Sequence, residues 1–220
     1  MPQLQQLEPL VPPLRFSALQ PNLYRGSYPR PVNYRYLKRL RLKYILSLTP
    51  EPITLETDAE LFQFCQKNNI RLIHIECGKE GSGKKKKRGV PIEYNTVIKT
   101  LELMINMDFS PMYIHCLNGG QVSSLVIACL RKLSFWSSVS IFNEFLVYSN
   151  SINIHDRSFI ENFIAEITVP LNKAPWIWRG LSKDVVGNHP TLKFVDINDR
   201  RYSDHAATTA AAAVAMTSTQ

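Results

Sequence analysis

One stretch of sequence decides the fold: Tyr113-Ile-His-Cys-Leu-Asn-Gly-Gly-Gln-Val-Ser-Ser124. An apolar run leads into the pair His115-Cys116, two glycines follow, and apolar residues then recur at helical spacing as far as Arg131. This pattern predicts a strand, a tight loop and a helix. Such a loop suits a phosphate group, because successive backbone N–H groups and the helix N-terminus converge on one anion.

Cys116 lies where a nucleophile would lie in such a loop. A helix N-terminus favours the thiolate, which is the form of cysteine that attacks phosphorus. The alternative, a buried cysteine at a strand end, is disfavoured by the histidine before it and the glycines after it. Ser123 either assists departure of the thiolate or is only a helix N-cap. The phosphate-binding residues that we expect are His115, Asn118, Gly119, Gly120 and Gln121.

An arginine is missing from this loop. In cysteine-dependent phosphatases the signature is His-Cys, five residues, Arg and then Ser or Thr, and here Val122 stands at the arginine position. Valine has no donor to replace a guanidinium that grips two phosphate oxygens. Losing one partner of a buried charge pair costs about 3 to 5 kcal/mol, so we expect a rate about two to four orders of magnitude below that of an active ancestor. Gln121 offers one neutral hydrogen bond in partial compensation.

Three blocks of the chain resemble the plant-and-fungal atypical dual-specificity phosphatases, and most of all the Oca-type tyrosine-phosphatase-like proteins of yeast. The blocks are Asn22 to Glu51, the loop around Cys116, and Leu130 to Glu161. The resemblance implies an α/β fold with a central, mostly parallel sheet flanked by helices. It also implies dephosphorylation of phosphotyrosine-type substrates or of inositol pyrophosphates. The family's loop carries Gly-Lys-His-Arg-Thr-Gly, whereas this chain has Gly119-Gly-Gln-Val-Ser-Ser124, so three functional side chains are replaced by neutral residues.

No general acid is evident in the sequence. Related phosphatases commonly use an aspartate on a mobile loop to protonate the leaving oxygen. Between Cys77 and Pro91 the only carboxylate is Glu80, and Glu76 and Glu93 flank this segment. A diphosphate needs less help, because its leaving phosphate is stable without a proton. The missing acid therefore argues against alkyl phosphate esters more than against diphosphates.

The alternation of strand and helix patterns along the chain predicts an α/β core. We expect helices over 34–42, 58–68 and 92–107, strands over 44–48 and 70–75, and helical structure from the loop to about residue 167. The predicted domains are an extended arm over 1–20, a phosphatase-like domain over 21–168 and a C-terminal extension over 169–220, disordered from about 205. Trp176 and Trp178 either pack back on the domain or bind a partner.

Basic residues raise further alternatives, because the chain has a net charge of +8. A run of five positive charges comprises Lys84, Lys85, Lys86, Lys87 and Arg88. This run is a cationic rim that steers polyanions to the site, a nuclear-localisation or nucleic-acid patch, or a solvated loop. Arg25 and Arg30 either bind anions or only keep their loop solvated.

Composition argues against several classes of protein. The four cysteines have irregular spacing, which argues against a zinc site or a disulfide framework, and we expect no metal and no cofactor. Prolines interrupt the apolar residues of the N-terminus, so it does not resemble a signal peptide. No apolar run is long enough to span a bilayer. We therefore expect no membrane partner and a cytoplasmic location, with the nucleus as an alternative.

Three functions are left open by the sequence. The first is a pseudophosphatase that binds an inositol pyrophosphate or a phosphoprotein, in a regulatory hetero-oligomer with related phosphatase-like proteins. The second is a slow protein-tyrosine or inositol-pyrophosphate phosphatase that uses Cys116. The third is a basic protein associated with nucleic acid, for which the sequence carries no recognised nucleic-acid motif.

Overall fold

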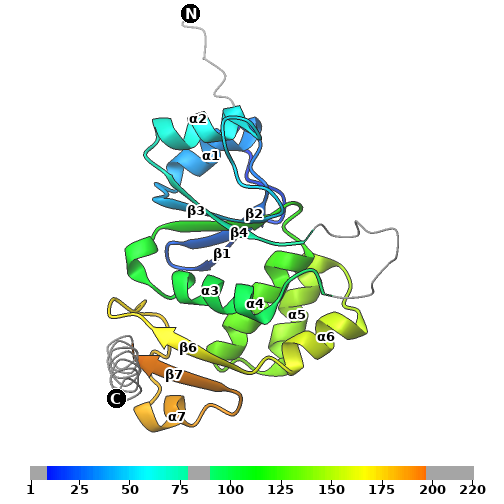
Figure 1. The fold of residues 1–220 in the computed structure, drawn as a ribbon, viewed down its shortest axis with the longest axis vertical. Coiled ribbons are helices and arrows are strands. Elements are labelled where there is room, and N and C mark those ends of the chain that lie inside the picture. The colour runs from blue at the N-terminus through cyan, green and yellow to red at the C-terminus, as the bar shows by residue number, and fades with distance from the viewer. Residues whose placement is uncertain (1–8, 79–89, 197–220) are drawn as a thin grey trace, which may run out of the picture.

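A computed structural model describes residues 9–78 and 90–196 of the chain (Figure 1). The strands are β1 (Ser17–Gln20), β2 (Leu23–Ser27), β3 (Tyr44–Thr49), β4 (Arg71–Glu76), β5 (Met112–Cys116), β6 (Ala165–Val169) and β7 (Leu192–Asp196). The helices are α1 (Pro31–Arg39), α2 (Ala59–Lys67), α3 (Tyr94–Met104), α4 (Gln121–Leu133), α5 (Ser138–Ser149), α6 (Ile154–Glu161) and α7 (Lys183–Gly187), with a 3-10 helix η1 (Met107–Phe109).

A five-stranded sheet with the order β1-β2-β5-β3-β4 organises the fold. The strands β2, β5, β3 and β4 run parallel, and only β1 is antiparallel to its neighbour. All five residues of β5 are buried, as expected for an apolar strand at the centre of a parallel sheet covered on both faces. The α/β fold with a mostly parallel central sheet, predicted from the sequence, is thus confirmed.

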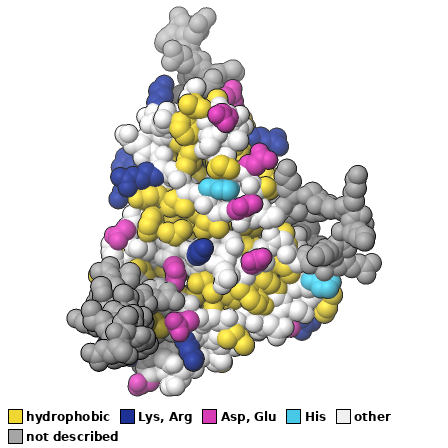
Figure 2. Space-filling model, in the orientation of Figure 1, with side chains coloured by type: hydrophobic (Ala, Val, Ile, Leu, Met, Phe, Trp, Pro, Cys, Tyr) yellow, Lys and Arg dark blue, Asp and Glu magenta, His cyan; other side chains and the backbone are white. Residues whose placement is uncertain are grey.

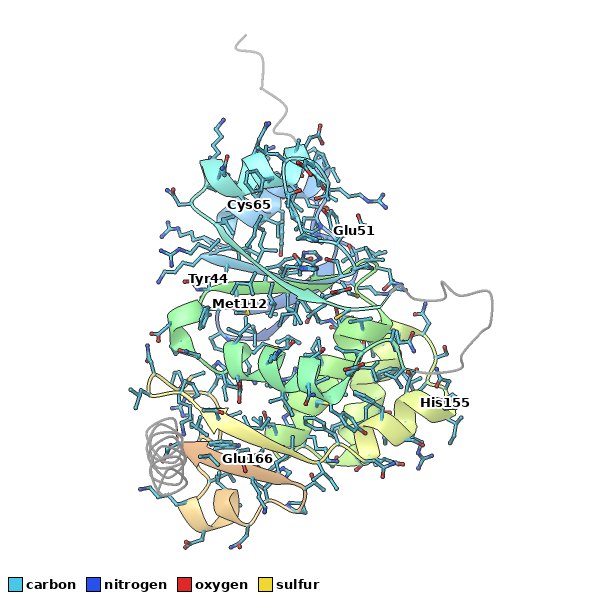
Figure 3. All side chains as sticks on the ribbon, viewed as in Figure 1. Tyr44, Glu51, Cys65, Met112, His155 and Glu166 are labelled. Atoms are coloured by element: carbon cyan, nitrogen blue, oxygen red, sulfur yellow. The ribbon has the colours of Figure 1, made fainter. Side chains whose placement is uncertain are left out.

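Helices cover both faces of this sheet, α1 and α2 on one face and α3, α4, α5 and α6 on the other (Figure 1). Successive residues of a strand point to opposite faces, so Tyr113 packs in the core beneath α1 and α2, and Ile114 packs in the core on the α4 side. Figure 3 shows Cys65 in the layer of α1 and α2, above the sheet, and Met112 at the sheet. The same alternation directs His115 and Cys116 to opposite faces.

Several predicted helices are confirmed with shifted ends. Asp58 accepts a hydrogen bond from the Leu61 N–H and caps α2, so the helix predicted over 58–68 occupies 59–67 between its two caps. α1 begins earlier than predicted, at Pro31, because proline suits the first position of a helix. The helix predicted over 92–107 is shorter, because α3 ends at Met104 and the separate turn η1 follows.

The N-terminal boundary of the predicted domain lies too late. The segment 1–20 was expected to be an extended arm, yet β1 pairs with β2 and belongs to the central sheet. Further upstream, the Asn33 side-chain amide donates to the Val11 carbonyl oxygen at 3.2 Å. The folded unit therefore includes residues that precede residue 21.

The C-terminal region also differs from the prediction. Helical structure was expected to about residue 167, but β6 is a strand that pairs in parallel with β7. The strands β6 and β7 therefore lie on both sides of the domain boundary that was expected at residue 169. Trp178 packs back on the domain, since its indole N–H donates to the Leu133 carbonyl oxygen at 2.8 Å. The disorder expected from about residue 205 lies outside the described residues.

The surface drawn in Figure 2 carries exposed hydrophobic side chains, with acidic and basic side chains scattered among them. Residues 79–89, which contain the predicted lysine-rich run, lie outside the described residues. Among residues 9–78 and 90–196, no helix has both the length and the apolar character needed to cross a membrane.

Candidate phosphate-binding site

Cys116 is the last residue of β5, and α4 begins five residues later at Gln121. The strand register sets Cys116 beside Ser27 at the carboxyl end of the sheet, which is where open α/β sheets bind ligands. The Cys116 side chain is 1% exposed. The predicted order of strand, tight loop and helix is confirmed. In this arrangement the first turn of α4 follows directly on the loop.

Gly119 allows the loop to turn tightly against β2. Its φ is +69°, in the left-handed region that favours glycine. A Cβ atom at Gly119 would lie 2.7 Å from both the Gly26 carbonyl carbon and the Ser27 nitrogen. Any side chain at Gly119 would therefore push the loop away from the sheet.

The Asn118 side chain organises the loop from within. Its Oδ1 atom accepts the Gly120 backbone N–H at 2.7 Å and the Cys116 thiol at 3.7 Å. The Gly120 N–H was expected to bind phosphate, but here it is engaged inside the loop. Arg15 donates to the Asn118 carbonyl oxygen at 2.9 Å and ties the loop to the segment before β1.

His115 points away from the loop and serves as a structural residue. Its Nδ1 lies 3.3 Å from the Cys116 carbonyl oxygen and its Nε2 lies 2.8 Å from the Ser47 hydroxyl. Because a carbonyl only accepts, Nδ1 carries the proton, and Ser47 donates to Nε2. Full burial lowers the pKa of His115 to about 4, so the ring is neutral near pH 7. The side chain, expected to bind phosphate, is instead committed to the sheet.

The arginine position of the loop is closed to solvent. Val122 is 2% exposed and belongs to the main hydrophobic core. Gln121, the neighbour expected to compensate, donates through Nε2 to Asp156 Oδ1 at 2.7 Å. Asp156 is itself 2% exposed and is also bound by Asn153 at 2.7 Å. The Gln121 side chain thus links α4 to α6.

Ser123 is a buried hydroxyl inside α4. Its side chain is 0% exposed, and its Oγ has no hydrogen-bond partner among the described residues. Gly120 is the N-cap of the helix, so the interpretation of Ser123 as an N-cap is wrong. An unpartnered buried hydroxyl is unfavourable, and that of Ser123 keeps an unused donor.

Arg25 is the site residue that sequence reasoning left unresolved. The side chain is 0% exposed, and its Nη2 donates to the Gly119 carbonyl oxygen at 2.8 Å and to Ser124 Oγ at 2.9 Å. It therefore does not keep its loop solvated. The sequence carried one sign of this burial. Residue 25 lies two positions after the apolar Leu23, so the two side chains face the same side of the strand.

The two carboxylates that flank residues 77–91 lie in one hollow. Glu76 and Glu93 line a cavity of about 400 Å³ that also includes Cys77. Burial is the main reason that the pKa of Cys77 is raised to about 12, and the Cys116 thiol contributes. Glu80 lies outside the described residues. Within the described ranges, no three His, Cys, Asp or Glu side chains come together as a metal site.

Comparison with known proteins shows which family the chain matches and which proteins it is similar to. The Tyrosine phosphatase family matches residues 10–182. The chain is 51% identical over 201 residues to the "Putative tyrosine-protein phosphatase OCA6" of Saccharomyces cerevisiae, covering 86% of this chain and 89% of that protein. It is 33% identical over 158 residues to the inositol diphosphatase DSP3 of Arabidopsis thaliana, covering 70% of this chain and 72% of that protein.

Two solved structures share the fold. The core catalytic domain of the PP-IP phosphatase SIW14 from S. cerevisiae, in complex with citrate, has a TM-score of 0.59 and 32% identity, covering 70% of this chain and 87% of that chain. A second structure of the Siw14 catalytic core has a TM-score of 0.60 and 31% identity, covering 70% of this chain and 88% of that one. These alignments confirm the predicted cysteine-dependent phosphatase fold.

Proposed function

The chain belongs to the Tyrosine phosphatase family, and we propose that it binds a phosphorylated ligand at the Cys116 loop with little or no hydrolysis. The observation that carries the proposal is Val122, which is buried in the apolar core at the position of the family's arginine. Between Cys116 and Ser124 the loop has no cationic side chain. Charge that develops in phosphoryl transfer would therefore lack its usual bidentate partner.

Binding a phosphate group requires fewer functional groups than hydrolysing it, and the groups that remain in and beneath the loop support binding. The N-terminus of α4 provides backbone N–H groups and the positive end of a helix dipole. Beneath the loop, Arg25 adds a positive charge, and Ser123 adds an unpartnered hydroxyl. These features favour an anion in the ground state without requiring turnover.

The ligand class follows from the relatives. Proteins 33% and 32% identical to this chain are an inositol diphosphatase and a PP-IP phosphatase, so we propose an inositol pyrophosphate as the ligand, with a phosphoprotein as the alternative. A regulatory assembly with related phosphatase-like chains is part of the same proposal. Co-purification of the chain with such partners, and its loss when the loop is altered, tests that part.

A slow phosphatase is the second candidate, and the position of Cys116 favours it. The thiol lies between the end of β5 and the start of α4, as an attacking group would, and Ser123 is free to assist its departure. A diphosphate would relieve the demand for a general acid, because its leaving group is stable without a proton.

Isothermal titration of the purified chain with an inositol pyrophosphate, with released phosphate followed in the same sample, separates these candidates. Binding without release supports the leading proposal. Release that disappears in Cys116→Ser establishes the slow phosphatase instead. If the chain shows neither binding nor release, an inositol pyrophosphate is excluded as ligand and as substrate, and the phosphoprotein alternative is then the one to test.

A further inference from the structure

Strand β4 forms one edge of the central sheet, because among the described residues it pairs only with β3. The Arg71 N–H donates to the Lys43 carbonyl oxygen at 2.8 Å, so every second residue of β4 from Arg71 onward faces β3. The backbone N–H and C=O groups of Leu72, His74 and Glu76 therefore point outwards, and no described residue pairs with them. Such a row of open backbone groups is a template for a further strand.

The amino end of this edge carries exposed cations, which we call the basic cluster. They come from the last turn of α1, the loop after it and the start of β4, and comprise Lys38, Arg39, Arg41, Lys43 and Arg71. None of the five forms an ion pair with a described carboxylate, and residues 9–50 contain no Asp or Glu. Figure 2 shows basic side chains gathered on the left flank, at the level where Figure 3 places Tyr44 at the start of β3.

Two ordinary explanations cover only part of the basic cluster. Cations in the last turn of a helix complement the helix dipole, which accounts for Lys38 and Arg39. A charge on an edge strand discourages aggregation, which accounts for Arg71. Neither explains Lys43 or Arg41, and Arg41 has a φ of +50°, in the left-handed region that favours glycine. An arginine at such a position, in place of glycine, points to a use for its charge.

A largely apolar hollow adjoins the same edge on the α3 side of the sheet. It has a volume of about 400 Å³, and its lining includes Ile75, Leu103, Phe109 and Pro170. The Phe109 ring packs edge-on against Tyr44, with the ring centroids 5.1 Å apart, so the hollow reaches the amino end of the sheet. The carboxylate in its lining, Glu102, already accepts the Thr168 N–H at 2.8 Å. The hollow thus offers room for an apolar side chain beside the basic cluster.

We propose that the β4 edge binds an extended, acidic segment of a partner protein, which adds to the central sheet as a further strand. The open backbone groups of β4 pair with the segment, its carboxylates meet the basic cluster, and an apolar side chain enters the hollow. The inference goes beyond the proposed function. The basic cluster lies at the amino ends of the parallel strands, whereas the Cys116 loop lies at their carboxyl ends.

Charge decides which occupant fits this edge. A second copy of the chain would bring a net charge of +8, which opposes its approach to the basic cluster. The chain's own segments outside the described ranges are not acidic. Residues 1–8 contain one acid, residues 79–89 are strongly basic, and in residues 197–220 two acids are matched by two arginines. The acidic segment must therefore come from another protein.

Other anionic partners use fewer of these features. A nucleic acid would use the cations but not the open backbone groups of β4. A membrane surface is disfavoured, because no exposed large apolar side chain belongs to residues 38–44 or 67–76. An acidic strand is the partner that uses the edge, the basic cluster and the hollow together.

The direct test is fluorescence anisotropy of the labelled peptide Asp-Glu-Glu-Val-Glu-Val-Thr-Val with the full chain, for which we expect a dissociation constant in the micromolar range. Two further peptides carry N-methyl groups on alternate amides, one on the odd positions and the other on the even positions. An added strand pairs through one of its edges only. One methylated peptide should therefore bind within about threefold of the unmodified peptide, and the other should bind about tenfold more weakly.

Variants of β4 test the same pairing from the side of the protein. The His74 N–H points outwards, so His74→Pro removes an edge donor and leaves the ladder to β3 in place. We expect it to weaken peptide binding by about tenfold. His74→Ala keeps the N–H and loses only the ring, whose Nε2 lies 2.7 Å from the Thr49 carbonyl oxygen, so its affinity should stay within about threefold of the parent. If His74→Pro does not fold, the methylated peptides test the pairing on the unaltered chain.

Charge variants test the basic cluster. Lys43→Gln combined with Arg71→Gln should weaken peptide binding by about tenfold, because each exposed ion pair contributes up to about fivefold. Lys183→Gln combined with Lys193→Gln is the matched control, since it removes the same charge from exposed positions on α7 and β7. The control should stay within about threefold of the parent.

Three results would overturn the inference. Equal affinities of the two methylated peptides would show that no strand is added to β4. Equal losses in the two charge variants would reduce the effect to net charge. A parent that fails to bind the peptide would reject the acidic segment, and binding of an oligothymidylate or of phosphatidylserine vesicles in its place would assign the basic cluster to a nucleic acid or a membrane.

Discussion

Single residues decide what this loop can do. At one position an apolar side chain stands where the family has a cation, and at another a cation is buried in the core. Val122 is an apolar core residue where the family carries an arginine, whereas Arg25 is a cation buried among core residues. Positive charge is thus present near Cys116, but it lies beneath the loop. From there it holds the loop through Gly119 and Ser124, yet it cannot grip two phosphate oxygens as a fork.

Restoring the arginine is the sharpest test at this scale. In Val122→Arg, a bidentate guanidinium should tighten binding of inorganic phosphate by about 10- to 100-fold, because charged hydrogen bonds contribute about 1.5 to 3 kcal/mol. Turnover of a diphosphate substrate should rise as well. Calorimetry and phosphate release measure the two effects, and Val122→Met controls for altered packing. A folded but unimproved Val122→Arg would mean that the bond between Gln121 and Asp156, or the missing acid, also limits the site.

The buried His115 makes stability depend on pH. Its folded pKa of about 4 lies below the ordinary 6.5, so between these values only the unfolded chain takes up the proton. Its neutral form is fully compatible with folding above pH 6.5, and stability is lost as pH falls through this window. The free energy of unfolding should drop by about 2 kcal/mol between about pH 7 and about pH 5.

Urea titrations of the parent and of His115→Gln measure this loss. Glutamine does not titrate, so the variant should lose about 2 kcal/mol less over the same pH range. Burial also lowers the pKa of His189, which adds a loss of the same sign to both proteins and cancels in the comparison. Equal pH slopes for parent and variant would show that His115 is not the source.

At the scale of elements, α2 depends on one capping residue. Asp58 Oδ1 accepts the Leu61 N–H at 2.9 Å, and Oδ2 accepts the Tyr28 hydroxyl at 2.9 Å. Asp58→Ala should lower the free energy of unfolding by about 1 to 2 kcal/mol, measured by urea denaturation. Asp58→Asn keeps the cap and should recover most of it. A loss in Asp58→Asn as large as in Asp58→Ala would mean that the carboxylate charge, not the cap, is what matters.

The sequence predicted those elements whose signals are local. The apolar run before Cys116, the glycines and the helical spacing after them lie within about twenty residues, and the corresponding strand, loop and helix formed as expected. The pair β6 and β7 was missed, because a strand pairing across more than twenty residues leaves no periodic mark in one segment. β1 was missed for another reason, because a strand of four residues is too short to show a clear alternation.

In the candidate site, too, some roles could be predicted from the local motif and others depend on distant contacts. Cys116 and Gly119 carry their roles in the local motif, and the structure brings both to the turn between β5 and α4. The contact of Arg25 with Gly119 spans 94 residues, and that of Gln121 with Asp156 spans 35. Side chains that find partners at such separations depend on the finished fold, so the engagement of Gln121 and the burial of Arg25 were not foreseen.

At the scale of the whole molecule, the C-terminal strands are part of the folded unit. β6 and β7 pair with each other rather than with the central sheet, but several contacts tie this region to the domain. The Thr168 N–H donates to Glu102 Oε1 at 2.8 Å, and the Ala174 N–H donates to the Ile105 carbonyl oxygen at 2.7 Å. Ile177 is 3% exposed in the main core.

These contacts predict that the C-terminal strands unfold together with the central sheet. Ile177→Ala removes a buried side chain and should lower the free energy of unfolding by about 2 to 4 kcal/mol, in a single urea transition followed by tryptophan fluorescence and by circular dichroism. Leu171→Ala is the matched control, because Leu171 is 71% exposed in the same segment and its loss should change stability by less than about 0.5 kcal/mol. Two separate transitions would contradict a single cooperative unit, because the strands would then melt while the sheet and its Cys116 loop stayed folded.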